Sequence, residues 1–184
     1  MSAPEVIIHR DAGLLAKAAA ARLVTRLVDA VTAHGSASLV LTGGGIGTAV
    51  LAELARAAKP EDHGPVPAFD VMLLGIGPEG HVASLFPGMP ALYDERSVVA
   101  VRGAPKPPPT RISMTFPSIN AAKEVWILAA GAEKAGAVSL ALSGDVGPKQ
   151  VPAVAARGRQ RTLFLLDTEA AAKVPSGIDR THAH

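Results

Sequence analysis

The sequence predicts a three-layer α/β/α domain, in which helices cover both faces of a mostly parallel, Rossmann-like sheet. Three observations predict this fold: apolar segments of strand length alternate with helical ones, some of these strands are apolar at consecutive positions, and two of them end in glycine-rich loops. A strand that is apolar on successive residues is buried on both faces, as the strands of a parallel sheet are. The length of 184 residues suits one such domain, so residues 1–184 are expected to form a single unit.

The first long helix is expected at residues 11–34. Its apolar residues, among them Leu23, Leu27 and Val31, keep largely to a spacing of four, which places them on one face of a helix. Gly35 follows as a C-terminal stop, because glycine readily adopts the left-handed conformation that ends helices.

Two strands that end in glycine loops follow this helix. Residues 38–41 form a short apolar run that reaches a glycine turn and leads into a second helix around residues 50–54. Residues 69–74 repeat the pattern, and their strand also ends in a glycine loop. Because ligands of open parallel sheets bind at the carboxyl ends of the strands, both loops are predicted to border a binding site.

The second half of the chain continues the alternation. Strands are expected at residues 97–101, 111–116, 124–129 and 162–166, and helices at residues 133–142 and 168–173. Asp167 is placed as the N-cap of the last helix. The proline cluster at residues 105–109 is expected to be a stiff extended loop, because proline fixes φ and lacks a backbone N–H.

Composition excludes several classes of protein. The chain has 48% hydrophobic and 18% charged residues, which is typical of a packed globular protein, and without cysteine it has no disulfide framework or thiolate site. No signal-like start and no long apolar run occur, so the cytoplasm is the expected location and a membrane partner is not expected. The net charge of +2 is scattered and aromatics make up 3%, which argues against nucleic acid and suits a small anionic substrate.

The first glycine loop, Thr42, Gly43, Gly44 and Gly45, is predicted to bind a phosphate. Glycines let backbone N–H groups approach an anion at the start of the following helix. A tight turn between strand and helix also favours glycine without any ligand, so this structural explanation stays open.

The second glycine loop is predicted to carry a general acid–base pair. Gly75, Gly77 and Gly80 match a dinucleotide-binding pattern, but Pro78 and the lack of a clear long helix afterwards argue against that interpretation. Glu79 stands two residues before His81, and a neighbouring carboxylate can fix the tautomer of an imidazole. A histidine that only bonds the loop backbone is the plainer alternative, yet the position beyond a buried strand favours catalysis.

Basic residues are expected to complete the anion site. Lys106 stands on the proline loop, Arg111 begins the strand after it, and Lys134 lies at the start of a predicted helix, where a cation is unfavourable for the helix dipole and a ligand would explain it. No group of His, Asp and Glu has the spacing of a metal site, so neither a metal nor another cofactor is expected.

Four segments together resemble the 6-phosphogluconolactonase family, whose fold is shared with glucosamine-6-phosphate deaminase. The segments are LTGGG (residues 41–45), GIGPEGHVASLFP (75–87), PKPPPTRIS (105–113) and AGAEKA (130–135), and the similarity extends over residues 6–176. The resemblance implies a metal-free hydrolase of the oxidative pentose phosphate pathway, which converts 6-phospho-D-glucono-1,5-lactone to 6-phosphogluconate. His81 would be the general base, Glu79 would orient it, and the first glycine loop with the three basic residues would bind the sugar phosphate.

One departure from the family concerns the stretch between the two glycine loops. Members normally carry a strand with Trp-Gly-Asp-Glu-Arg there, and residues 59–68 are too short for another strand, crossover and strand. A strand–helix–strand segment is therefore expected to be missing near residues 58–60, either because the full protein is longer or because the chain is a shortened copy. An amino-sugar-phosphate isomerase/deaminase and a non-catalytic sugar-phosphate-binding domain stay as alternatives, and the assembly is expected to be a monomer or a small homo-oligomer.

Overall fold

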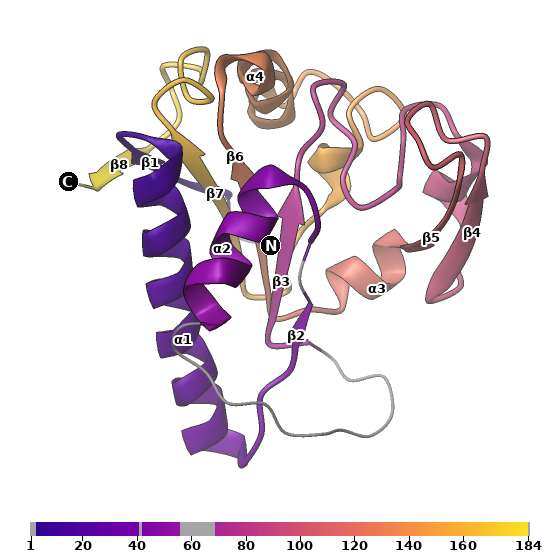
Figure 1. Cartoon of the computed structure of the whole chain (residues 1–184). Helices are drawn as coiled ribbons and strands as arrows, with labels where there is room; N and C mark the ends of the chain where they lie inside the picture. The colour runs from indigo at the N-terminus through magenta and orange to yellow at the C-terminus, as the bar shows by residue number, and fades with distance from the viewer. Residues whose placement is uncertain (1–2, 41, 56–68, 184) are drawn as a thin grey trace.

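A parallel sheet forms the centre of the molecule. The computed structural model describes residues 3–40, 42–55 and 69–183, and in them a six-stranded sheet has the order β2-β3-β6-β7-β1-β8 (Figure 1). Every neighbouring pair in this order is parallel. These strands are β1 (Glu5–His9), β2 (Leu39–Val40), β3 (Val71–Gly75), β6 (Glu124–Ala129), β7 (Arg161–Asp167) and β8 (Arg180–Ala183). The predicted Rossmann-like fold is confirmed.

Helices cover both faces of the sheet. They are α1 (Ala12–His34), α2 (Gly45–Ala55), α3 (Phe116–Asn120) and α4 (Ala135–Ser143), with short 3₁₀ turns at Pro90–Tyr93, Ala132–Lys134 and Pro152–Ala155. One hydrophobic core joins α1 and α2 to the sheet, and it contains the buried Trp126. A second core on the opposite face joins α3 and α4 to the sheet. Figure 1 shows α1 and α2 together on one side of the strands.

The first helix begins and ends where the sequence predicts. The Asp11 carboxylate accepts a hydrogen bond from the Leu14 amide at 2.8 Å, which satisfies an N–H at the start of α1. At the other end Gly35 has φ of 76° and its amide donates to the Val31 carbonyl. Leu15 and Leu23 face the core with no exposed surface, so the apolar spacing identified the buried face in the first half of the helix. In the second half it was wrong, because Leu27 is only partly buried and Val31 is 48% exposed.

Two predicted strands form a separate ribbon instead of joining the parallel alternation. β4 (Val98–Arg102) and β5 (Thr110–Met114) pair antiparallel with each other, and the proline loop connects them. Their connection of seven residues is too short for the crossover that parallel strands need. Phe116, expected as the end of the second strand, begins α3 because Pro117 suits the first turn of a helix.

The C-terminal region differs from prediction in two ways. Residues 168–173 form hydrogen-bonded turns and not a helix, since six residues before Pro175 are too few to repay helix nucleation. Asp167 nevertheless caps the first turn, where its carboxylate accepts from the Ala170 amide at 2.8 Å. The polar tail forms β8, which pairs with β1. The segment expected to be missing near residues 58–60 lies outside the described residues.

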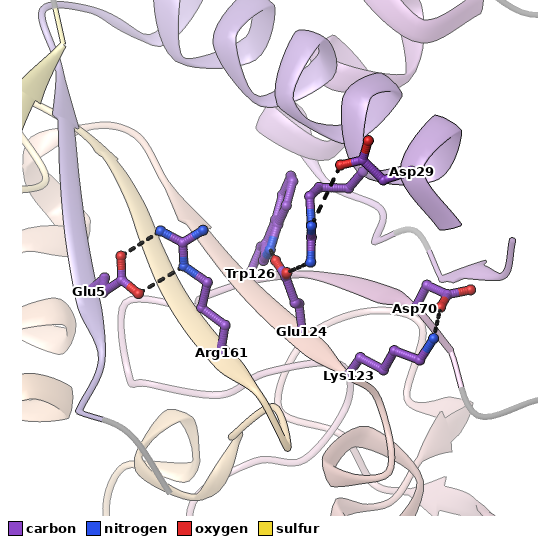
Figure 2. Close-up of polar contacts among 8 residues, drawn as sticks. Glu5, Asp29, Asp70, Lys123, Glu124, Trp126 and Arg161 are labelled. Carbon is purple, nitrogen blue, oxygen red and sulfur yellow. Dashed lines mark hydrogen bonds and ion pairs between the residues drawn. The ribbon is translucent and has the colours of Figure 1, made fainter. Parts of the chain in front are cut away.

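Ion pairs tie together the amino edge of the sheet (Figure 2). Glu124 is buried at the start of β6, where it accepts hydrogen bonds from the Arg26 guanidinium on α1 and from the Trp126 indole N–H. Beside it Lys123 donates to the Asp70 carboxylate at 2.6 Å. This edge lies opposite the glycine loops, so its ion pairs stabilise the sheet at a distance from the predicted binding site.

Candidate active site

The two glycine loops lie side by side at the carboxyl edge of the sheet. The Gly75 amide at the end of β3 donates a hydrogen bond to the Thr42 hydroxyl oxygen at 3.2 Å, which joins the loop after β2 to the loop after β3. A cavity of about 660 Å³ opens there, and it is lined by both loops, by β5 and by the turn before α4. A site of this size at the strand ends suits a small phosphorylated molecule.

The first glycine loop forms an exposed helix N-terminus on the cavity. Gly43, Gly44 and Gly45 line the cavity and are exposed, and α2 begins at Gly45. Gly44 has φ of 86°, a left-handed conformation that favours glycine. The first N–H groups of a helix have no partners within it, and the helix dipole adds positive potential. The loop can therefore hold a phosphate.

The second glycine loop is a tight turn that presents His81. The Gly77 amide donates to the His81 carbonyl and the Gly80 amide donates to the Gly77 carbonyl, both at 2.9 Å. A Cβ atom at Gly77 would lie 2.0 Å from His81 Nδ1, so the imidazole occupies space that only glycine leaves free. The side chain of His81 is 16% exposed and lines the cavity.

Glu79 bridges the imidazole and a lysine. Its Oε1 atom lies 3.0 Å from His81 Nδ1, and its Oε2 atom accepts a hydrogen bond of 3.0 Å from Lys106 Nζ. The contact with Nδ1 does not have hydrogen-bond geometry, so it is an electrostatic contact. The carboxylate is thus placed to favour the tautomer that carries its proton on Nδ1.

The electrostatic surroundings keep the imidazole neutral and the carboxylate ionised. Burial lowers the pKa of His81 below 6.5; Glu79 opposes this shift, and the charges of Lys106 and Lys134 add to it. Burial raises the pKa of Glu79, but a hydrogen bond from its own amide, the Lys106 hydrogen bond and the charge of His81 together bring it below 4.5. A neutral imidazole beside a carboxylate is the form that a general base requires.

Arg111 holds the proline loop. Its Nε donates to the Pro108 carbonyl at 2.9 Å, and its Nη2 donates to the carbonyls of Lys106 and Pro107, each at 2.8 Å. The guanidinium also lies over the Phe86 ring, 5.4 Å from its centroid. Arg111 lines the cavity, and it holds the loop that carries Lys106 in place.

Lys134 reaches the cavity from the turn that precedes α4. Its side chain is 22% exposed and its Nζ lies 3.9 Å from the Glu133 carboxylate. The turn is fixed by Gly131, whose amide donates to both carboxylate oxygens of Asp167 at 3.0 and 3.2 Å. Asp167 therefore connects the end of β7 to the turn of Lys134.

The cavity brings together most of the residues that the sequence singled out. Its lining includes Thr42, Gly43, Gly44, Gly45, His81, Lys106, Arg111 and Lys134, and Glu79 contacts the cavity through His81. Within the part of the chain that the structure describes, no group of three His, Asp or Glu side chains is placed to hold a metal, and no helix is long and apolar enough to span a bilayer.

Sequence reasoning missed three residues of the site. Phe86 stacks on His81 with 4.5 Å between ring centroids, Glu133 lines the cavity beside Lys134, and the buried Ser113 hydroxyl accepts a hydrogen bond from the Ser84 amide at 3.0 Å. Each lies inside one of the four quoted segments. Their place within those segments was a signal, but no pattern indicated which neighbour each would contact.

Fold and site define a Rossmann-like α/β protein with a phosphate-type glycine loop and a histidine–carboxylate pair at the carboxyl edge of its sheet. The model of one family, glucosamine-6-phosphate isomerases/6-phosphogluconolactonase, matches residues 56–165. A 6-phosphogluconolactonase of Streptomyces coelicolor is 41% identical over 252 aligned positions, which cover 95% of this chain and 96% of the relative. The chain belongs to this family.

A second relative agrees with this assignment, and a solved structure agrees with the fold. A 6-phosphogluconolactonase of Mycobacterium tuberculosis is 54% identical over 138 positions, which cover 73% of this chain and 55% of that relative. The structure of 6-phosphogluconolactonase from Trypanosoma brucei superposes with a TM-score of 0.76 at 21% identity, over 94% of this chain and 99% of that one. The 252 positions aligned with the Streptomyces relative exceed the 184 residues of this chain, so that relative has residues without a counterpart here.

Proposed function

We propose that this chain hydrolyses 6-phospho-D-glucono-1,5-lactone to 6-phosphogluconate. The observation that carries the proposal is the 3.0 Å contact between His81 and Glu79 at the wall of a cavity that the first glycine loop also lines. The lowered pKa values of both groups favour a neutral imidazole beside an ionised carboxylate. The names of the curated relatives support the same reaction. The enzyme is then a carboxylic ester hydrolase of the pentose phosphate pathway. It works in the cytoplasm as a monomer or small homo-oligomer, without a cofactor and without nucleic-acid or membrane partners.

Substrate binding begins with the phosphate. Its oxygens accept hydrogen bonds from the backbone amides of Gly43, Gly44 and Gly45 at the start of α2, and Lys134 supplies a positive charge from the other side of the cavity. Lys106 and Arg111 add positive potential along the proline-loop wall. Held by its phosphate, the lactone ring lies against the second glycine loop.

The chemical step uses the two nitrogens of His81 differently. With Nδ1 protonated beside Glu79, Nε2 takes a proton from a water molecule as the water oxygen bonds to the lactone carbonyl carbon. The bond between that carbon and the ring oxygen then breaks, and the imidazolium returns the proton to the departing oxygen. Water is consumed, a carboxylic acid and a hydroxyl form, the acid releases its remaining proton to solvent, and His81 ends in its starting state.

The direct test replaces His81 with alanine. The variant should hydrolyse the lactone at least about a hundredfold more slowly once the uncatalysed rate is subtracted, the usual scale for a positioned general base. Binding of 6-phosphogluconate, measured by calorimetry, should persist because the phosphate contacts remain. His34→Ala, an exposed histidine at the end of α1, is the matched control and should keep the wild-type rate. A His81→Ala enzyme with normal turnover would refute the assignment.

A non-catalytic sugar-phosphate-binding role is the second reading, favoured by one specific observation. The chain lacks the Trp-Gly-Asp-Glu-Arg strand and is shorter than its alignment with the Streptomyces relative. We infer that a strand–helix–strand segment is missing near residues 58–60. An intact mass above 18.7 kDa together with turnover would place that segment in the full enzyme, whereas a mass of 18.7 kDa without turnover would support the binding role. Ammonia release from glucosamine 6-phosphate would instead indicate the deaminase alternative.

A further inference from the structure

Five side chains form a closed series of contacts around the general base. In order they are Arg111, Phe86, His81, Glu79 and Lys106, and the series returns to Arg111 through the backbone of the proline loop. We call this series the His81 circuit. It joins the second glycine loop to the proline loop and to β5, which follows that loop directly in sequence.

The first route from Arg111 to His81 runs through the proline loop. Three donated hydrogen bonds, of 2.8 to 2.9 Å, fix the carbonyls of residues 106–108 against the guanidinium. The fixed backbone places Lys106 Nζ 3.0 Å from Glu79 Oε2, and Glu79 Oε1 is the atom that contacts His81. Displacement of the loop would therefore move Lys106, and through its hydrogen bond to Glu79 it would change the position of the carboxylate that contacts the imidazole.

The second route runs through an aromatic ring. The Arg111 guanidinium lies 5.4 Å from the centroid of Phe86, and the Phe86 and His81 centroids are 4.5 Å apart with 36° between the ring planes. Phe86 is 1% exposed, so it has no room to move without its neighbours. Arg111 covers one side of this ring and His81 contacts it as well, which limits the orientations open to the imidazole.

We propose that Arg111 is a positioning residue for the general base, acting through the proline loop and through Phe86. The inference rests on the proposed function for its catalytic meaning, but the placement of the imidazole is measurable without turnover. Only arginine fits this position: a planar guanidinium with five donors can bond several carbonyls and stack on a ring together, whereas the lysine ammonium is a compact point charge. The Arg111→Lys substitution would keep the charge and lose the clamp.

The charged groups that face His81 determine how its pKa would change if the proline loop loosened. They are Glu79 on its own loop, Lys106 on the proline loop, Lys134 before α4, and Arg111 behind Phe86. If the proline loop loosens, Lys106 moves away and water reaches the ring. Both the burial and the lysine charge that lower the pKa of His81 are then reduced, and Glu79 is freed to attract the imidazolium. The pKa of His81 should rise toward its ordinary value.

The experiment measures His81 directly in the ligand-free protein. The ring resonances are followed by NMR against pH in wild type, Arg111→Lys and Arg111→Ala, and are assigned by their loss in His81→Ala. Arg102→Ala, an exposed arginine on the neighbouring strand β4, is the matched control. Both Arg111 variants should titrate at a higher pH than wild type, and the control should not. Thermal melting establishes that each variant is folded.

Kinetics on the same samples separate positioning from substrate contact. For Arg111→Lys we expect kcat to fall about tenfold or more with KM changed less than about threefold, because the charge remains while the base is misplaced. Lys106→Met should shift the titration midpoint of His81 in the same direction. Adding Lys106→Met to Arg111→Ala should shift this midpoint little further, since both substitutions break the route through the proline loop.

Two results would overturn the inference. One is an unchanged His81 midpoint in a folded Arg111→Lys or Arg111→Ala variant. The other is a raised KM with unchanged kcat in Arg111→Lys, which would make Arg111 a substrate contact alone. The first result is measured without turnover, so a failure of the proposed lactonase activity would leave the NMR result interpretable and would be recognised separately.

Discussion

Gly77→Ala should disable the site while leaving the fold intact. A Cβ atom at residue 77 would lie 2.0 Å from His81 Nδ1, 2.2 Å from His81 Cε1 and 2.8 Å from Glu79 Oε2. Ordinary contacts between heavy atoms are roughly 3.5 Å, so the imidazole has to retreat by more than about 1 Å. A displacement of that size at a reacting group costs about a hundredfold in rate.

The same substitution should change stability little. Gly77 is not among the glycines with positive φ, so alanine fits its backbone, and the atoms in the way belong to side chains that can swing into the cavity. We expect the free energy of unfolding in urea to change by no more than about 1 kcal/mol. Gly158→Ala offers the contrast, because its Cβ would meet the Arg161 carbonyl at 2.2 Å and the backbone cannot yield.

The assay compares lactone hydrolysis and urea unfolding for each variant. Gly136→Ala is the matched control, since it lies in α4 with open space where the added methyl group would stand, and it should keep the wild-type rate and gain up to about 1 kcal/mol. The reasoning is refuted if Gly77→Ala retains full activity, or if it loses activity only by unfolding.

Two further predictions concern the amino edge of the sheet (Figure 2). Glu124→Ala should lower the free energy of unfolding by about 2 kcal/mol, measured in urea, because it leaves the buried Trp126 N–H without its acceptor, while the half-exposed Arg26 keeps its ion pair with Asp29; a loss below about 1 kcal/mol would show that the network contributes little. The hydrogen bond from Arg161 holds the pKa of Glu5 below 4.5, so their pairing stabilises fully above that pH and is lost as pH falls through the lowered pKa. Glu5→Gln should cost at most about 1 kcal/mol near pH 6 and progressively less as pH falls through the lowered pKa of Glu5, and a cost that stays constant as pH falls would contradict this origin.

The regular elements were predictable where burial imposes a pattern. The strand at residues 124–129 matches β6 at both ends because every one of its residues is buried, and α1 was bounded by its capping residues. The ribbon β4–β5 was found as two strands, but its pairing depends on the length and stiffness of the proline loop, which periodicity does not describe. The C-terminal strand β8 is short and polar, and only its pairing with β1 makes it a strand.

The sequence singled out residues that line one cavity, but it did not predict their partners. Lys106 was expected to face the anion, and the structure pairs it with Glu79. Arg111 was expected beside it in the same role, and most of its donors bind loop carbonyls. Such pairings depend on side-chain directions across segments distant in sequence, and a single sequence contains no measure of those directions.

Hydrogen bonds that involve loops hold this site in place, because His81, Glu79 and Lys106 all lie in loops. Three anchors do this: Thr42 receives the Gly75 amide, Ser113 receives the Ser84 amide, and Asp167 receives the Gly131 amide. Each joins the loop after one strand to a neighbouring segment, so the loops keep fixed positions relative to each other while the buried sheet supplies the stability. Loss of one anchor should therefore misplace a catalytic or binding side chain before it unfolds the protein, because the hydrophobic cores on both faces of the sheet stay packed.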